Sequence, residues 1–218
     1  MNPPPDGDVD RFNEEDITNR VLGATARSGT PTVAVWEPNA TVSFGPRDVT
    51  HSGYDQAVAT ARAKGYDISH RRMGGRPVAM HDGCLAFVYG MPREGSIESR
   101  YESVITMVAA TVESMGVRVR QTAVHASFCP GQHSLVGAGK IAGFAQRVRD
   151  DAVAVGGIII VRGHDRLTAL LSPIYDALDL SFDQTTVSSL NDSGANCTPA
   201  EFHSALECQF SRHATTAL

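Results

Sequence analysis

The sequence predicts an α+β fold in which a mixed or antiparallel sheet packs against helices. Strand-like and helix-like segments are interspersed along the chain, without the regular spacing that builds a doubly wound parallel sheet. With 218 residues, of which 42% are hydrophobic, the chain is long enough to bury one sizeable core. We therefore expect a single domain over residues 11–218, preceded by a flexible lead over residues 1–10.

The amino-terminal third is expected to contain two helices and three strands. Residues 10–27 have helix-compatible apolar spacing. Residues 32–36 and 40–44 are rich in β-branched and aromatic side chains and are separated by a Glu-Pro-Asn turn, so they are expected to be strands. Residues 54–64 form a short amphipathic segment that ends at a glycine, which indicates a helix. Residues 66–70 are expected to form the third strand.

The middle of the chain contains the clearest helix. Residues 98–115 place their apolar side chains on one face at a period of 3.6 residues, and a glycine ends the pattern. A buried strand is expected at residues 85–89, and an alternating strand at residues 117–122. Residues 140–146 and 152–161 are expected to be two antiparallel strands separated by a charged segment.

The carboxy-terminal part is expected to supply two more helices. Residues 167–178 have helical spacing, but Pro173 is expected to interrupt them because proline lacks the backbone donor of a helix interior. Thr198 and Glu201 form a capping box, with Pro199 at the first helical position. The last helix is therefore expected to run from Pro199 to about His213.

Composition and charge argue against several classes of protein. The 24 acidic residues outnumber the 19 basic ones, so no general attraction to nucleic acid or to an anionic membrane is expected. No apolar run is long enough to span a bilayer, and the start lacks the features of a signal peptide, which favours a cytoplasmic location. The scattered histidines indicate no metal site. Four cysteines without CxxC spacing are expected to be free thiols: Cys84, Cys129, Cys197 and Cys208.

A glycine-rich stretch after the third expected strand is the first candidate binding site. Gly74 and Gly75 allow backbone N–H groups to approach an anion or a carbonyl closely. Arg71 and Arg72 supply charge and forked hydrogen bonds, and His81 could orient a substrate. The spacing matches neither a Walker A loop nor a dinucleotide fingerprint. The alternative is a tight surface turn with solvated arginines.

A cysteine and a lysine 11 residues later form the second candidate site. Cys129 precedes a Pro-Gly pair and is therefore expected on a loop, where a nearby cation such as Lys140 could lower its pKa. His125 or His133 could accept the thiol proton. The alternative is a buried structural cysteine. Two glycines near the lysine favour the functional interpretation, because glycines in a strand mark a close approach of a ligand or another backbone: Gly139 and Gly143.

At these residues the chain resembles the superfamily of lipoate–protein ligases, octanoyltransferases and biotin ligases. Arg71 to Asp82 is similar to the family's Arg-Arg-x-Ser-Gly-Gly-Gly-Ala-Val-x-His-Asp stretch, and Gly139 to Arg147 to its Gly-x-Lys-x-x-Gly stretch. Ser127 to Gly131 resembles the Ser-Tyr-Cys-Pro-Gly segment of the cysteine-dependent branch, the octanoyl–glycine cleavage H protein:protein N-octanoyltransferases. The resemblance implies the fold of class II aminoacyl-tRNA synthetases and biotin–lipoate ligases.

The resemblance also implies a transfer through an acyl-enzyme. Cys129 would attack the carbonyl of an octanoyl or lipoyl group, and Lys140 would bind the acyl oxygen. The acceptor would be a lysine on a lipoyl domain, from the glycine cleavage H protein or from E2 subunits of 2-oxoacid dehydrogenases, and no cofactor would be needed. The implied substrate-binding residues are Arg71, Arg72, Gly74, Gly75, His81, Gly139 and Gly143.

Two departures from the family pattern bear on the alternatives. Pro77 replaces a glycine and removes a backbone donor, and the family's asparagines after His-Asp are absent here. Both losses favour the transferase over an ATP-dependent lipoate ligase, which would use ATP and Mg. A third possibility is a protein that binds the acyl group without turning it over.

Overall fold

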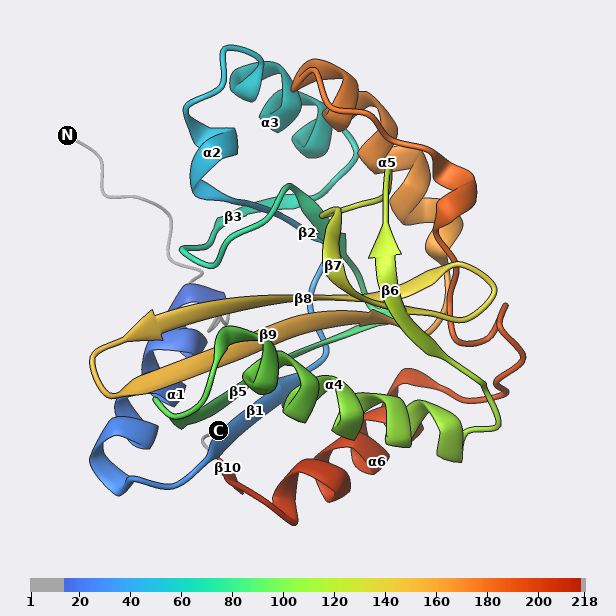
Figure 1. The fold of residues 1–218 in the computed structure, drawn as a ribbon. Helices are drawn as coiled ribbons and strands as arrows, with labels where there is room; N and C mark the ends of the chain where they lie inside the picture. The colour runs from blue at the N-terminus through green and yellow to red at the C-terminus, as the bar shows by residue number, and fades with distance from the viewer. Residues whose placement is uncertain (1–13, 217–218) are drawn as a thin grey trace, which may run out of the picture.

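The computed structural model describes residues 14–216, and the lead expected over residues 1–10 lies outside them. A seven-stranded sheet runs through the centre of the molecule (Figure 1). Its neighbouring strands are antiparallel, except that β1 and β10 are parallel. In spatial order the strands are β10 (Thr215–Thr216), β1 (Thr32–Trp36), β5 (Cys84–Pro92), β9 (Ala152–Ile160), β8 (Lys140–Arg149), β7 (Gly131–Val136) and β6 (Arg120–Val124).

A second, three-stranded sheet packs near the large one. β2 (Thr41–Phe44) lies between β3 (Asp67–His70), to which it is parallel, and β4 (Val78–Met80), to which it is antiparallel. The turn after Trp36 carries the chain from one sheet to the other, so β1 and β2 do not pair with each other. The two sheets together confirm the predicted α+β class with mixed strand directions.

Helices cover both faces of the large sheet (Figure 1). One face carries a hydrophobic core shared with α4 and α6, while the other packs against α1 and against the small sheet with α3 and α5. The helices are α1 (Glu14–Ser28), α2 (Pro46–Val49), α3 (Tyr54–Ala63), α4 (Ile97–Ser114), α5 (His164–Ala177) and α6 (Pro199–Ser211), with a 3-10 turn at Gln184–Thr186.

The expected interruption of α5 at Pro173 is wrong, because the helix continues through the proline. Leu170 and Leu171 before it and Ile174 and Tyr175 after it are all buried in one core. This packing offsets the backbone hydrogen bond that proline removes. The capping box of α6 is confirmed, since the Thr198 side chain accepts from the N–H of Glu201 and the Glu201 carboxylate accepts from the N–H of Thr198.

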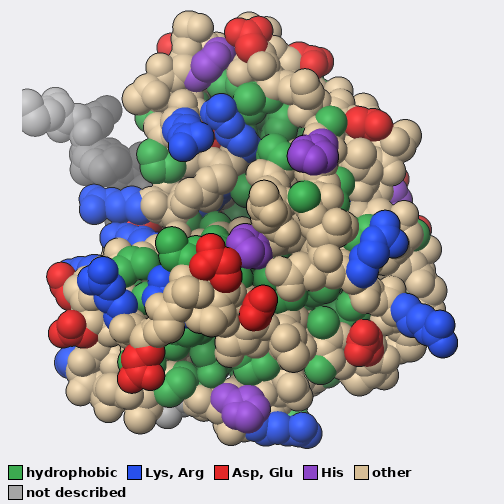
Figure 2. Space-filling model, in the orientation of Figure 1, with side chains coloured by type: hydrophobic (Ala, Val, Ile, Leu, Met, Phe, Trp, Pro, Cys, Tyr) green, Lys and Arg blue, Asp and Glu red, His purple; other side chains and the backbone are tan. Residues whose placement is uncertain are grey.

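Several elements depend on pairing that local sequence does not indicate. The short helix α2 and the strands β4 and β7 were not expected, and β6 begins three residues later than predicted. Strand β8 continues to Arg149, through most of the segment expected to link it to β9. No helix within residues 14–216 is long and apolar enough to cross a membrane. Acidic and basic side chains are interspersed on the face shown in Figure 2.

Candidate active site

A narrow apolar slot lies between the large sheet and the glycine-rich loop of residues 71–77, which connects β3 to β4. Its volume is about 50 Å³. Glycine and alanine residues of two neighbouring strands line it: Gly143 and Ala145 on β8, and Gly156 and Gly157 on β9. Met73 and Val78 are among the residues that complete its wall, as are Phe128, Cys129, Phe144 and Trp36. The lining is suited to an aliphatic chain.

Cys129 lies at this slot, on the loop between β6 and β7. Its backbone is in the left-handed region, with φ of 40°, which is uncommon for a residue other than glycine. Its sulfur faces the backbone of Gly75, so that a Cβ on Gly75 would overlap the thiol. Gly75 itself has φ of 110°, a conformation that side chains disfavour. Of the two glycines, Gly75 therefore leaves room for the thiol, whereas Gly74 faces open space.

Lys140, the first residue of β8, holds the cysteine loop from within the protein. Its side chain is fully buried, and Nζ donates to the carbonyl oxygens of Phe128 at 2.8 Å and Cys129 at 2.9 Å. The ammonium also lies 4.4 Å from the centre of the Phe128 ring. Burial lowers the pKa of Lys140 to about 8, an effect that the neighbouring Cys129 opposes. With a pKa of about 8, Lys140 is mostly protonated at neutral pH, so an ammonium contacts the backbone carbonyl of Cys129.

At the two glycines near Lys140, other parts of the chain come close to the backbone. A Cβ on Gly143 would lie 3.2 Å from Cε of Lys140 and 3.4 Å from the Phe128 ring. Gly143 thus leaves the space that the lysine side chain occupies. A Cβ on Gly139 would lie 3.0 Å from the carbonyl oxygen of Thr186, so Gly139 leaves space for the backbone at Thr186. Gly139 does not line the slot.

The hydroxyl of Tyr175, on α5, connects the cysteine loop to the glycine-rich loop. The Cys129 N–H donates to this hydroxyl at 2.7 Å, and the hydroxyl donates to the carbonyl of Pro77 at 3.0 Å. Burial raises the pKa of Tyr175 far above its ordinary value, so the hydroxyl stays protonated. Sequence analysis did not identify this residue. The only local signal was a polar group on the apolar face of a helix.

The glycine-rich loop is held by contacts within the chain. Arg71 donates to the carbonyls of Ser43 at 2.5 Å and Arg76 at 2.6 Å. Arg76 pairs with the buried carboxylate of Asp48 at 3.0 Å, and the other oxygen of that carboxylate accepts from the N–H of Gly45 at 2.8 Å. Arg71 and Arg76 therefore both hold the loop in place, and Arg71 also lines the slot.

Two of the other predicted site residues lie away from the slot. His81 is only 2% exposed, and its Nδ1 accepts from the N–H of Gly83 at 2.8 Å. Its Nε2 must then carry the proton that it donates to the carbonyl of Gly163 at 3.0 Å. The ring thus links the turns at Gly83 and Gly163 by hydrogen bonds and has no free polar atom for a substrate. Arg72 is exposed and pairs with Glu15 at 3.7 Å.

Neither candidate proton acceptor reaches the thiol within residues 14–216. His125 is exposed just after β6. The ring of His133 stacks on Tyr101, with 3.8 Å between centroids, and burial lowers its pKa. No hydrogen bond joins either histidine to Cys129 among these described residues.

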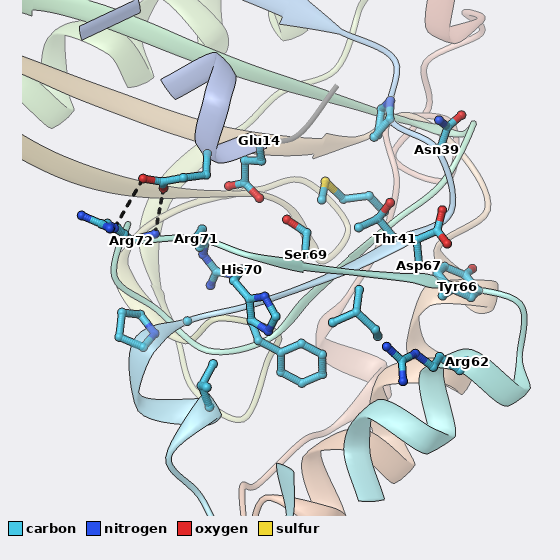
Figure 3. A pocket seen from close by; sticks show the side chains of 18 of the residues that line it. Glu14, Asn39, Thr41, Arg62, Tyr66, Asp67, Ser69, His70, Arg71 and Arg72 are labelled. Carbon is cyan, nitrogen blue, oxygen red and sulfur yellow. Dashed lines mark hydrogen bonds and ion pairs between the residues drawn. The ribbon is translucent and has the colours of Figure 1, made fainter. Parts of the chain in front are cut away.

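A wider cleft of about 1010 Å³ adjoins the slot (Figure 3). Arg62, His70 and Arg72 line it, together with acidic and uncharged polar side chains. Figure 3 shows these side chains extending from α1, from the turn before β2, from α3 and from β3. The cleft and the slot have four lining residues in common: Glu14, Trp36, Arg71 and Met80. Across residues 14–216, no three His, Cys, Asp or Glu side chains gather as a metal site would require.

The fold and the sequence together identify the family of this domain. A sequence model of the lipoyl protein ligase A/B catalytic domain matches residues 14–211, and the chain belongs to this family. An octanoyl-GcvH:protein N-octanoyltransferase of Geobacillus kaustophilus is 33% identical over 135 residues, which cover 60% of this chain and 48% of that protein. The chain thus spans about half the length of this relative.

Solved structures agree with the family at the level of the fold. Lipoate-protein ligase A bound with ATP superposes with a TM-score of 0.70 at 19% identity, covering 92% of this chain and 83% of that one. The bi-partite lipoate protein ligase of Thermoplasma acidophilum, studied with its E2 lipoyl domain, gives a TM-score of 0.66 at 18% identity, with 92% and 81% covered. The predicted resemblance to lipoate ligases and octanoyltransferases is confirmed.

Proposed function

We propose that the protein transfers an octanoyl or lipoyl group through a thioester on Cys129 to a lysine of a lipoyl domain. The observation that carries this proposal is the position of the thiol: Cys129 lies at an apolar slot, beside a buried lysine ammonium. A thiolate there would meet the carbonyl of an acyl chain that occupies the slot. The name of the Geobacillus kaustophilus relative, an octanoyltransferase, supports the same activity.

The reaction balances without an activating cofactor. Thiolate attack on the donor acyl carbonyl forms a C–S bond and breaks the bond to the donor's amine or thiol, which leaves with the proton lost by the Cys129 thiol. The acceptor lysine then attacks the thioester as a neutral amine and forms an amide, and the proton that it loses restores the Cys129 thiol. Two of the three ammonium donors of Lys140 bind carbonyls, and the third is assigned to the negative oxygen of each tetrahedral intermediate.

The partners proposed are proteins that present a modified or acceptor lysine on a lipoyl domain. The donor would be an octanoyl-carrying protein, such as the glycine cleavage H protein in the relative's name. The acceptor would be a second lipoyl domain, such as that of an E2 subunit. Contact with either protein is expected to be transient and of modest area.

A second candidate function is ATP-dependent lipoate ligation. The wide cleft with arginines on its wall, next to the slot, is the observation in its favour. However, Cys129 and Gly143 do not line that cleft. At the loop that faces the thiol, Pro77 offers only a carbonyl, which Tyr175 already binds. These features favour the transferase.

The test is intact-mass analysis of the purified protein after incubation with an octanoylated carrier protein in the absence of ATP. The proposal predicts a gain of one octanoyl group that hydroxylamine removes and that Cys129→Ser prevents. Cys208→Ser is the matched control, because Cys208 is an exposed thiol on α6. Modification of a lipoyl domain only after ATP and free acid are added would establish the ligase instead. Binding of octanoate without turnover in both arms would leave a non-catalytic binder.

A further inference from the structure

The backbone of Cys129 is held at both of its polar groups. Its N–H donates to the hydroxyl of Tyr175, and its carbonyl accepts from Nζ of Lys140. Between these two contacts the residue adopts a left-handed conformation that L side chains rarely take. Strained conformations of this kind persist only where the surroundings impose them. Tyr175 and Lys140 are therefore the contacts that impose it.

The Tyr175 hydroxyl also determines which donors are free at the thiol. Because the Cys129 N–H is bound to this hydroxyl, it is not available to stabilise an oxyanion, as the amide of a nucleophile often does. The hydroxyl in turn donates to the carbonyl of Pro77 in the glycine-rich loop, two residues after Gly75, against which the thiol rests. One buried hydroxyl thus connects the nucleophile to the loop that covers the slot.

We infer that Tyr175 is a positioning residue, whose hydroxyl orients Cys129 for attack on the acyl carbonyl and keeps the thiol aligned with the glycine-rich loop. This inference rests on the proposed acyl transfer. Two hydrogen-bond donors near the thiol then have different roles. The Cys129 N–H anchors the nucleophile, and the Lys140 ammonium stabilises the negative charge that develops on the acyl oxygen. Tyr175 touches no reacting atom, so its effect should appear in the rate of acylation and not in substrate affinity.

The test compares Tyr175→Phe with wild-type protein in two reactions of the same thiol. Acylation by an octanoylated carrier protein requires a defined attack geometry, whereas alkylation by iodoacetamide does not. Loss of the hydroxyl is expected to slow formation of the acyl-enzyme about tenfold or more, the change produced by about 1.4 kcal/mol. The KM for the carrier protein and the alkylation rate of Cys129 should change less than about threefold.

Two internal controls separate positioning from a general loss of structure. Tyr89→Phe removes another partly buried hydroxyl, one that donates to the carbonyl of His213 at 3.3 Å far from the thiol, and should leave acylation unchanged. Alkylation of the exposed Cys208, measured by peptide mass analysis, shows whether iodoacetamide was equally reactive in each sample. In wild-type protein, the amide hydrogen of Cys129 should exchange slowly with solvent because it donates to a buried oxygen.

The outcomes are distinct. Acylation at the wild-type rate in Tyr175→Phe would overturn the inference, as would an equal fall in acylation and alkylation, which would indicate altered thiol chemistry. Rapid exchange of the Cys129 amide in wild-type protein would also overturn it, even if the variant did not fold. Absence of an acyl-enzyme in wild-type protein would instead refute the proposed function.

Discussion

Replacing Lys140 by methionine should change how the stability of the protein depends on pH. Methionine has a similar length and no charge, so the variant removes the buried ammonium while leaving most of the volume filled. In the folded protein, burial lowers the pKa of Lys140 to about 8, against an ordinary value of 10.5. In the unfolded chain the ordinary value applies. Between these two values, the unfolded state therefore binds one more proton than the folded state.

The sign and size of the effect follow from this difference in bound protons. The free energy of unfolding rises with pH wherever the unfolded state binds more protons, here by about 1.4 kcal/mol for each pH unit. The free energy of unfolding of wild-type protein should therefore rise by roughly 3 kcal/mol relative to that of Lys140→Met as pH rises from about 8 to 10.5. Below about pH 8 the difference between the two proteins should be constant. The loss of two carbonyl hydrogen bonds in the variant does not depend on pH and cancels from the slope.

The assay is urea unfolding of both proteins at several pH values from neutral to 10.5. Titrating groups other than Cys129, which interacts with Lys140, are common to both proteins and cancel in the comparison. Acyl-enzyme formation should meanwhile fall by about 10²- to 10³-fold in the variant, because methionine offers no donor to the acyl oxygen. Parallel stability curves for the two proteins would refute the reasoning that Lys140 is held as a desolvated cation.

Two further substitutions test the glycine-rich loop. Gly75→Ala should slow acylation at least about 100-fold and destabilise the fold by roughly 1–3 kcal/mol, because its Cβ would overlap the Cys129 sulfur at a backbone φ of 110°. Gly74→Ala, whose Cβ meets no atom within 4 Å, is the matched control, and equal rates for the two variants would contradict this account. Arg76→Met should lower the free energy of unfolding by about 2 kcal/mol in urea, because it leaves the buried Asp48 carboxylate without its cation. An unchanged urea midpoint would show that the hydrogen bond from the Gly45 N–H is enough to stabilise the buried Asp48 carboxylate.

Local sequence patterns predicted the elements whose signals are contained within a few turns of chain. The amphipathic period of α4 and the capping box of α6 each indicate a helix without reference to the rest of the molecule. Strand β7 gave no such signal. Its sequence, in which only Leu135 and Val136 have large apolar side chains, becomes a strand because β6 and β8 pair with it on either side. The expected break at Pro173 was wrong for the same kind of reason, since core packing on both sides outweighs a local preference.

The sequence by itself determined the α+β class, and motif resemblance singled out Cys129 and Lys140, because residue order and spacing carry both signals. Only the tertiary structure decided what surrounds the thiol. Tyr175 lies 46 residues away from Cys129 along the chain, and its contact exists only because α5 packs beside the cysteine loop. Likewise, His81 was a candidate substrate-binding residue, but in the structure it is buried and links two turns by hydrogen bonds. A hydrogen bond depends on distances of about 3 Å between groups that folding brings together, and linear spacing does not specify such distances.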